Sequence, residues 1–176
     1  AQECGYVALN EPLVHSVLVA TPLLLSLNNK ELKQTWLPKI ASGEAKIVVG
    51  VDENGLVEDA HTADLLLLQS GDEIHAIEKA NVTLQANESI DPCRQLFAVE
   101  WTPSPATCVA TGENATALIT ATINRGAVAC AAQALGLTQR MLDMTVQYTS
   151  DRQQFGKPIG SFQAVKHSMA NVAVRW

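Results

Sequence analysis

Residues 148–167 read YTSDRQQFGKPIGSFQAVKH, and this stretch decides how the end of the chain is interpreted. Tyr148 is the last apolar residue of a long helical pattern. Glycine and proline gather in residues 151–160, and such a density interrupts a helix, so a loop is predicted there. Ser161 is predicted to cap a second helix. Two helices joined by a polar loop are therefore expected.

Apolar residues at helical spacing precede and follow this loop. A helix of about 35 residues is predicted from Asn114, since its apolar positions recur with the period of a helix. Its predicted stripe is Leu118, Ile119, Ile123, Ala127, Cys130, Ala134, Leu137, Met141 and Tyr148. The second helix carries Val165, Met169, Val172 and Trp176. Most of the first stripe is small, which permits close packing of helices.

The N-terminal part, residues 1–46, also reads as helical. The apolar stretch 14–27 is expected to break at Thr21-Pro22, because proline lacks an N–H and disfavours helix before it. Residues 30–41 form a second helical pattern, which Pro38 is expected to kink or end.

The middle part, residues 47–111, reads as short strands. The predicted strands are 47–51, 63–69, 73–77, 81–85, 96–101 and 107–110. Several short strands separated by turns are typical of a small sandwich or open barrel. The expected fold is therefore α+β, with N-terminal helices, a central β domain and, over 112–176, the first helices of an antiparallel bundle.

Composition and charge exclude some classes of protein. The chain has 176 residues, of which 47% are hydrophobic and 17% charged, as in a globular protein. A net charge of −6 argues against non-specific binding of nucleic acid. Residues 94–176 nevertheless carry seven basic and four acidic side chains, which suits an anionic small ligand. Ordinary solvated helix faces explain these counts equally well.

Cysteine usage predicts a reducing compartment and no metal site. No C-x-x-C pair and no histidine at ligand spacing accompany Cys4, Cys93, Cys108 and Cys130. Cys130 lies in an alanine-rich run and is expected to be a small buried hydrophobe. No signal-type segment is recognised, and the apolar stretch 14–27 is too short to span a membrane. The expectation is a cytoplasmic protein without a membrane span.

Residues 148–167 strongly resemble the signature of the acyl-CoA dehydrogenase family. In that family a long helix ends in an Arg-x-x-Phe-Gly loop, and a Phe-Gln pair opens the next helix. Residues 36–44, WLPKIASGE, resemble the family's junction between N-terminal helices and β domain. Residues 131–139, AAQALGLTQ, resemble its first long C-terminal helix. The resemblance extends over essentially the whole chain and is weakest between residues 51 and 110.

The resemblance implies a reaction and partners. FAD would accept a hydride from the β-carbon of an acyl-CoA thioester while a carboxylate removes the α-proton, which leaves a trans-2-enoyl-CoA. It implies a homo- or hetero-oligomer, either a dimer or a tetramer. It also implies an electron-transfer flavoprotein as acceptor and a place in lipid metabolism, such as fatty-acid β-oxidation.

Arg152 is the first cofactor residue that the resemblance implies. In the family this arginine reaches the diphosphate of FAD, often one bound mainly by a neighbouring subunit. A guanidinium group suits the task, because its planar fork of donors matches phosphate oxygens. The structural alternative is that Arg152 caps the last carbonyls of the long helix, where a cation is favourable.

The other site residues are carried over in the same way. Gln154, Phe155 and Gln163 are expected to contact the adenosine end of FAD. Phe155 is equally a candidate core anchor for the loop, and Gln163 a partner for the free amides of a first helical turn. Gly156 is expected to supply a backbone conformation that a Cβ would hinder. Arg125 matches only loosely an arginine near the substrate thioester and CoA.

No residue of this chain is assigned as the catalytic base. Residues 124–127, where some family members carry a glutamate, contain no carboxylate. Residues 52–55 stand where the family has a longer loop that contacts the flavin ring. The chain is therefore expected to be an incomplete dehydrogenase subunit. The alternative is a non-catalytic or degenerate subunit that completes the FAD site of a partner chain, and a carboxylate beyond Trp176 would distinguish the two.

Overall fold

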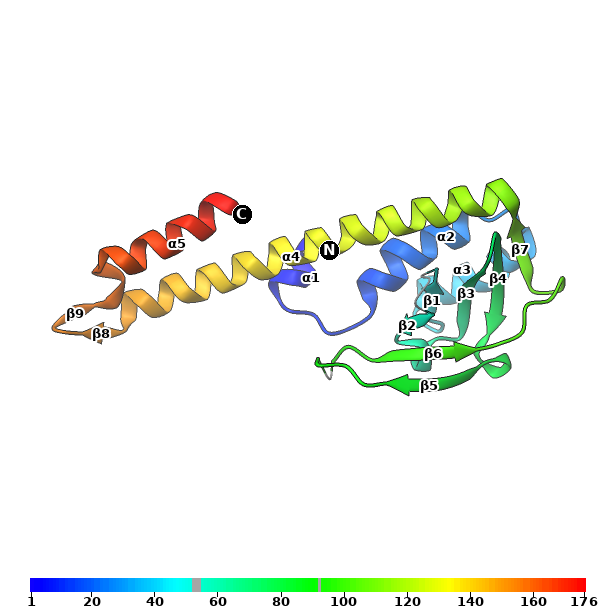
Figure 1. Ribbon diagram of the computed structural model, residues 1–176, viewed down its shortest axis with the longest axis horizontal. Helices are drawn as coiled ribbons and strands as arrows, with labels where there is room; N and C mark the ends of the chain where they lie inside the picture. The colour runs from blue at the N-terminus through cyan, green and yellow to red at the C-terminus, as the bar shows by residue number, and fades with distance from the viewer. Residues whose placement is uncertain (52–54, 92) are drawn as a thin grey trace. The chain divides into compact units, whose positions relative to one another are not determined.

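The fold was analysed in a computed structural model, which describes residues 1–51, 55–91 and 93–176 (Figure 1). The chain divides into two compact units. One unit comprises Asn10–Ala129, and the other comprises Ala1–Leu9 together with Cys130–Trp176. The long helix α4, Gly112–Asp151, contributes residues to both units. The division into residues 1–46, 47–111 and 112–176 follows the order of secondary structure and stays a prediction about domains.

The N-terminal helices run through both prolines that were expected to interrupt them. The elements are α1 (Gln2–Tyr6), the π-helical turn η1 (His15–Ala20), α2 (Thr21–Ser26) and α3 (Lys30–Ser42). The predicted break at Thr21-Pro22 is wrong, because η1 continues into α2 with Thr21 helical and the proline in the first turn of α2. Pro38 likewise lies inside α3, which ends only at Gly43 with a left-handed φ of 79°.

Four strands form the larger sheet, in the order β1-β3-β4-β7. They are β1 (Ile47–Gly50), β3 (Leu65–Ser70), β4 (Glu73–Glu78) and β7 (Cys108–Thr111). β1 runs parallel to β3, and the other neighbours are antiparallel. The four consecutive leucines of β3 are all buried, since alternate leucines point to opposite faces and both faces are covered.

A second sheet of three antiparallel strands has the order β2-β6-β5. Its strands are β2 (Leu56–Glu58), β6 (Leu96–Glu100) and β5 (Thr83–Asn87), with 3₁₀ turns η2 (Ala60–Thr62) and η3 (Lys79–Asn81) beside them. β2 was not predicted, because three residues are too few to show a period. One apolar cluster joins both sheets and includes Leu66, Leu68, Val57 and Phe97. The predicted α+β fold is confirmed.

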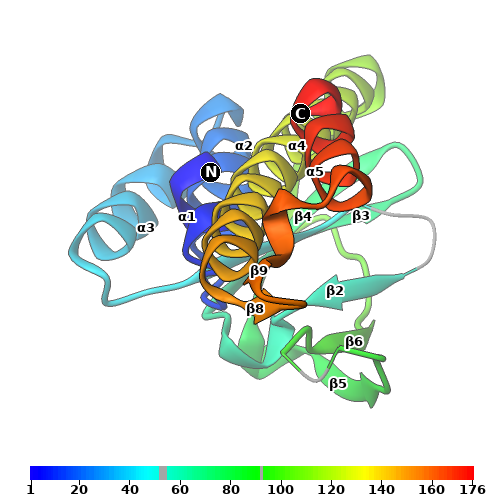
Figure 2. The same ribbon diagram turned by 90° about the vertical axis from the view of Figure 1, so that its left-hand side faces the viewer.

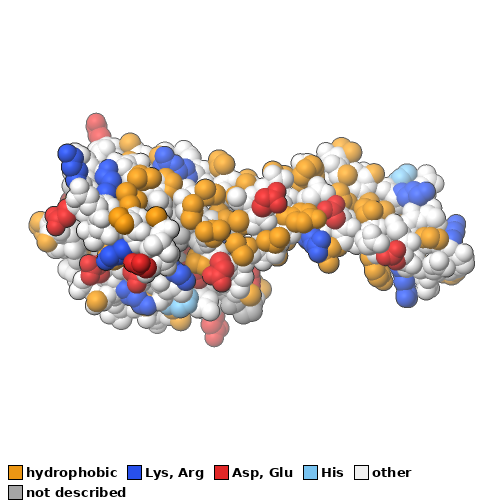
Figure 3. All heavy atoms as spheres, turned by 180° about the vertical axis from the view of Figure 1, so that it is seen from behind, with side chains coloured by type: hydrophobic (Ala, Val, Ile, Leu, Met, Phe, Trp, Pro, Cys, Tyr) orange, Lys and Arg blue, Asp and Glu red, His pale blue; other side chains and the backbone are white. Residues whose placement is uncertain are grey.

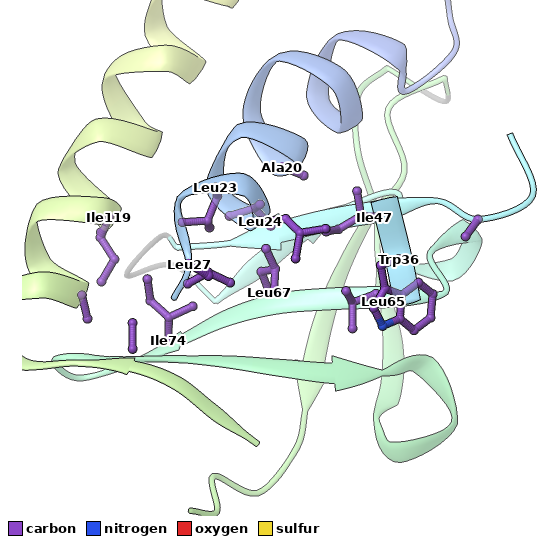
Figure 4. Packing of buried hydrophobic residues seen from close by; sticks show 14 residues of the cluster. Ala20, Leu23, Leu24, Leu27, Trp36, Ile47, Leu65, Leu67, Ile74 and Ile119 are labelled. Atoms are coloured by element: carbon purple, nitrogen blue, oxygen red, sulfur yellow. The ribbon is translucent and has the colours of Figure 1, made fainter. Parts of the chain in front are cut away.

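Helices cover the opposite face of the larger sheet, as Figure 4 shows. Leu23 and Leu24 of α2, and Leu27 directly after it, are fully buried there. They pack with Leu67 of β3 and Ile119 of α4. Full burial of an aliphatic side chain contributes about 1.5–3 kcal/mol relative to exposure, so this cluster is a main source of stability in the unit Asn10–Ala129.

The buried residues of α4 share only Ile119 with the predicted stripe. Ala115, Ile119, Thr122, Ala129 and Gly136 are buried. The exposed hydrophobic side chains of α4, part of the exposed hydrophobic surface seen in Figure 3, are Ile123, Val128, Leu135, Leu137, Met141, Met144, Val146 and Tyr148. Cys130 is also exposed, which contradicts its expected burial. An apolar period locates a helix, but it does not say which of two apolar sides the chain covers.

The helices of the other compact unit are packed closely (Figure 2). α5 (Gln163–Arg175) runs back along α4, and Trp176 Nε1 donates a hydrogen bond of 2.9 Å to the carbonyl oxygen of Leu135. α1 crosses α4 at two glycines: a Cβ on Gly136 would overlap the carbonyl oxygen of Gln2, and one on Gly5 that of Gln133. The crossing therefore requires glycine on both helices.

α4 is also long and apolar enough, by length and composition alone, to cross a membrane. The expectation of no membrane span was drawn from the stretch 14–27, which is shorter than α4. Core helices of helical bundles pass the same test, so the property alone does not assign α4 to a membrane.

Candidate functional site

The loop predicted after α4 is a short β-hairpin. β8 (Gln153–Gln154) pairs antiparallel with β9 (Lys157–Pro158), and two residues connect them. Both connecting residues have a positive φ, 55° at Phe155 and 76° at Gly156. Such a pair is typical of a type I′ turn, whose twist matches that of the flanking strands. Gly156 thus adopts the left-handed conformation expected of it. Phe155 adopts the same conformation although its Cβ disfavours it.

Backbone contacts attach the hairpin to the end of α4, and a side-chain contact joins α4 to α5. The Arg152 N–H donates to the Tyr148 carbonyl at 2.9 Å, and the Ile159 N–H donates to the Arg152 carbonyl at 2.8 Å. A Cβ on Gly160 would lie 2.9 Å from the Thr149 carbonyl oxygen, so the chain passes close to the end of α4. Thr149 is buried, and its Oγ1 lies 3.5 Å from Met169 Sδ of α5. The hairpin is therefore held in place.

Cofactor residues implied by the resemblance lie together and face solvent. Arg152, Gln154 and Gln163 are exposed, and the Phe155 side chain is 91% exposed. Phe155 is therefore not a core anchor. The Gln163 amide lies 3.4 Å from Nε2 of His167, and no side-chain hydrogen bond caps the first turn of α5 within the described residues.

Two predictions about the start of α5 are corrected by this geometry. Ser161 does not cap the helix, since it lies in the 3₁₀ turn η4 (Ile159–Ser161) and Phe162 precedes the first residue of α5. Gln163 does not fold back onto free amides, because its side chain points along the helix to His167. The Gln163 amide thus remains accessible to a ligand.

Aromatic and cationic side chains order the tip of the hairpin. The Phe155 and Phe162 rings meet edge to face, with centroids 6.1 Å apart and planes at 90°. Lys157 Nζ lies 4.5 Å from the centroid of the Phe162 ring. Lys157 was not singled out from the sequence, because only the turn geometry brings it over a ring five residues away.

The donor set of the hairpin suits an anionic, partly aromatic ligand. Arg152 offers a fork of N–H donors for phosphate oxygens, and Gln154 and Gln163 offer amides that donate and accept. Lys157 adds a second positive charge, and the exposed Phe155 ring offers an apolar face. These groups fit the diphosphate and adenosine portions of a dinucleotide such as FAD.

Arg125 is exposed on α4 and belongs to the other compact unit, so it is not part of the hairpin cluster. Its expected role near a thioester stays a prediction. Residues 124–127 lie on α4 and contain no carboxylate. The predicted shortening at residues 52–55 falls mainly on 52–54, which lie outside the described residues.

Two titratable groups of the sheet-containing unit have shifted pKa values. Burial lowers the pKa of His15 below its ordinary value of 6.5, although the nearby carboxylates of Glu58 and Asp59 oppose the shift. The Val49 N–H donates to His15 Nε2 at 3.2 Å, which a neutral ring accepts. Burial, and then the charge of Glu58, raise the pKa of Asp59. Neither group lies in the hairpin.

Comparisons with known proteins agree on one family. A family model described as "Acyl-CoA dehydrogenase, C-terminal domain" matches residues 116–176. The acyl-CoA dehydrogenase IpdE2 of Mycolicibacterium smegmatis is 33% identical over 99% of this chain and 50% of its own length. The chain thus spans about half the length of the curated relatives it matches.

Solved structures share the fold at lower identity. A glutaryl-coenzyme A dehydrogenase in complex with glutaryl-CoA has a TM-score of 0.85 and 21% identity, over 98% of this chain and 55% of its own. The ChsE4-ChsE5 complex from Mycobacterium tuberculosis has a TM-score of 0.80 and 23% identity, over 97% of this chain and 54% of its own. Sequence and fold together lead to one conclusion: the chain belongs to the acyl-CoA dehydrogenase family.

Proposed function

We propose that this chain is part of an FAD-dependent acyl-CoA dehydrogenase. The observation that carries the proposal is the hairpin of residues 152–158, whose exposed Arg152, Phe155 and Gly156 stand at the Arg-x-x-Phe-Gly positions of the signature that the chain resembles. Bound FAD would supply the redox chemistry, as the acceptor of a hydride from the β-carbon of an acyl-CoA thioester. The residues of this chain bind and orient.

Arg152, Gln154, Phe155 and Gln163 would hold the cofactor. The Arg152 guanidinium would neutralise diphosphate charge, and the two amides would donate to and accept from the adenosine end. Gly156 keeps the turn in its left-handed conformation. Arg125 would bind the CoA end of the substrate from α4, independently of the hairpin. None of these residues removes a proton, so the catalytic base has no assignment in this chain.

An oligomer, homo- or heteromeric, is part of the proposal. The exposed hydrophobic side chains of α4 support it, because apolar surface in quantity is characteristic of an interaction surface. A chain with this fold occurs in the structure of the ChsE4-ChsE5 complex. A cytoplasmic location and an electron-transfer flavoprotein as the electron acceptor complete the proposal. The location rests on cysteine usage and on the lack of a recognised signal-type segment, and the acceptor rests on the resemblance alone.

The visible absorption spectrum of the purified protein tests the proposal. The protein is scanned after addition of FAD, before and after each of a panel of acyl-CoA thioesters under anaerobic conditions. We expect a bound-flavin spectrum that one thioester class bleaches, since reduced flavin loses its visible bands. Bound flavin that no thioester bleaches would contradict the dehydrogenase activity and favour the non-catalytic subunit. Absence of bound flavin would contradict the cofactor assignment itself.

A further inference from the structure

A second group of chemically active side chains lies on the larger sheet, apart from the hairpin. The potential ligand atoms of Glu73, His75 and Cys108 all lie within 4.8 Å of one another. Glu73 and His75 are two residues apart on β4 and therefore point to the same face. Cys108 is the cross-strand partner of His75 on β7. Two adjacent strands thus present carboxylate, imidazole and thiol at one place.

A register irregularity helps to bring the cysteine into this group. Ile74 pairs with Ala110 while His75 pairs with Cys108, so Val109 is an extra residue on β7. An extra residue of this kind re-aims the side chains around it. Val109 and Ala110 both pack toward the helix-covered core, whereas Cys108 lies across from His75. No local sequence spacing reveals this arrangement, because the cysteine follows the histidine by 33 positions.

The His75 ring is fixed by its surroundings. The ring is fully buried and lies beside Trp101, with centroids 5.0 Å apart. Its Nδ1 is 3.0 Å from Thr107 Oγ1. The Thr107 hydroxyl has one hydrogen, which it donates to the Ser104 carbonyl at 3.0 Å. Thr107 Oγ1 is therefore placed to accept the Nδ1 hydrogen, an arrangement that leaves the Nε2 lone pair available to a ligand.

That lone pair faces a carboxylate. Nε2 of His75 and Oε2 of Glu73 are 3.1 Å apart. Either a proton on Nε2 or a metal ion between the two atoms accounts for this distance. The neighbouring thiol favours the metal ion, because thiolate, imidazole and carboxylate are the ligands of zinc. Metal-bound histidines also donate their other N–H to a polar group, and Thr107 Oγ1 lies at that position, 3.0 Å from Nδ1 of His75.

We propose that Glu73, His75 and Cys108 bind a divalent zinc ion that joins β4 to β7. Tetrahedral zinc with bonds of about 2.0–2.3 Å holds its ligand atoms about 3.3–3.8 Å apart, so the three donors need only small rotations to close on it. The Glu73 side chain is 42% exposed, which leaves room for water as a fourth ligand. The site is independent of the proposed cofactor and of the dehydrogenase reaction.

Cobalt(II), a spectroscopic substitute for zinc, tests the site in the metal-stripped full chain. One equivalent of cobalt should give a thiolate-to-cobalt charge-transfer band and tetrahedral visible bands, and zinc should abolish both. C108S should lose the charge-transfer band and bind zinc at least about tenfold more weakly in a chelator competition, because it removes one ligand. C93S is the matched control, since it removes an exposed cysteine elsewhere in the same unit; it should behave as the unmodified chain.

Two further variants keep the test decisive. E73Q replaces a partly exposed ligand without disturbing the core, and T107V removes the partner of Nδ1 together with the hydrogen bonds that Thr107 Oγ1 makes to Ser104. Both should weaken zinc binding, T107V by about 10–100-fold, with an unchanged far-ultraviolet circular dichroism spectrum. A charge-transfer band that persists in C108S, or that C93S abolishes, would overturn the proposal. Failure of the unmodified chain to bind cobalt would show that a proton, not a metal, lies between His75 and Glu73.

Discussion

Phe155 combines a backbone that disfavours its side chain with an exposed ring at the proposed cofactor site. Its φ is 55°, a region that asparagine and glycine tolerate better than other residues. The ring is almost wholly exposed, so core packing does not explain the choice of phenylalanine. Backbone strain that burial does not offset is characteristic of residues kept for a function, which supports the proposed contact with the cofactor.

Two substitutions separate the backbone of Phe155 from its ring. Phe155→Ala and Phe155→Asn both remove the ring, but asparagine tolerates the left-handed conformation. We expect the asparagine variant to be more stable than the alanine variant by about 1 kcal/mol in urea denaturation. Both variants should bind FAD more weakly than the unmodified chain, and by the same factor. If the asparagine variant kept the FAD affinity of the unmodified chain while the alanine variant lost it, the affinity would depend on stability, and the Phe155 ring would make no contact with FAD.

His15 gives the sheet-containing unit a defined pH dependence. Its pKa in the folded chain is lowered below 6.5 by burial, so the unfolded chain binds the proton more readily. The stabilisation by neutral His15 is complete above pH 6.5 and is lost as the pH falls through that value toward the folded pKa. We therefore expect the free energy of unfolding to fall between pH 7 and pH 5.

His15→Gln is the control, because the glutamine carbonyl accepts from the Val49 N–H but does not titrate in this range. The difference in free energy of unfolding between the two proteins, measured by urea denaturation at each pH, isolates His15 from Asp59. An equal loss of stability in both proteins on acidification would rule out His15 as the cause.

At the scale of elements, sequence located most helices and strands, and the misses have separate physical causes. The run of four leucines correctly indicated a strand, and the glycine-rich stretch after α4 correctly indicated an interruption. The sequence did not predict the hairpin at Phe155-Gly156, because phenylalanine is rare at a left-handed turn position. Pro38 does not end α3, because the helix continues past it for one turn.

The prediction of which side of α4 is buried was the less accurate one. Its small and apolar residues occupy more than one side, so periodicity fitted a stripe that is largely exposed. The candidate cofactor residues, in contrast, come from the signature alone, because five of them fall within twelve consecutive positions, and their role stays a prediction. The group of Glu73, His75 and Cys108 was missed, because it depends on strand pairing and an extra residue.

Two glycines on α4 allow a matched test of the crossing with α1. Gly136→Ala introduces a Cβ that overlaps α1 backbone, and overpacking of this kind destabilises by about 1–3 kcal/mol. Gly126→Ala gains the same helix propensity, but nothing lies within 4 Å of its Cβ, so it should stabilise by up to about 1 kcal/mol. Urea denaturation and proteolysis of residues 1–9 measure both. Equal stability of the two variants would mean that α1 does not pack there.

At the scale of the whole molecule, membership of the acyl-CoA dehydrogenase family explains the order of helices, sheets and helices. The apolar helix α4, with 40 residues, is part of this fold. The chain spans about half the length of its curated relatives. What the chain itself contributes is a fixed hairpin with a defined donor set.

The affinity for FAD of four proteins tests this contribution most directly. They are the unmodified chain, Arg152→Ala, Arg152→Lys and Arg175→Ala, with affinity measured by quenching of flavin fluorescence. Loss of hydrogen bonds to a charged group costs about 2 kcal/mol, so Arg152→Ala should bind about thirtyfold more weakly, with Arg152→Lys in between. Arg175→Ala removes the same charge at the end of α5, away from the hairpin, and its affinity for FAD should stay within about twofold of that of the unmodified chain. Equal affinity of Arg152→Ala and Arg175→Ala would contradict the account.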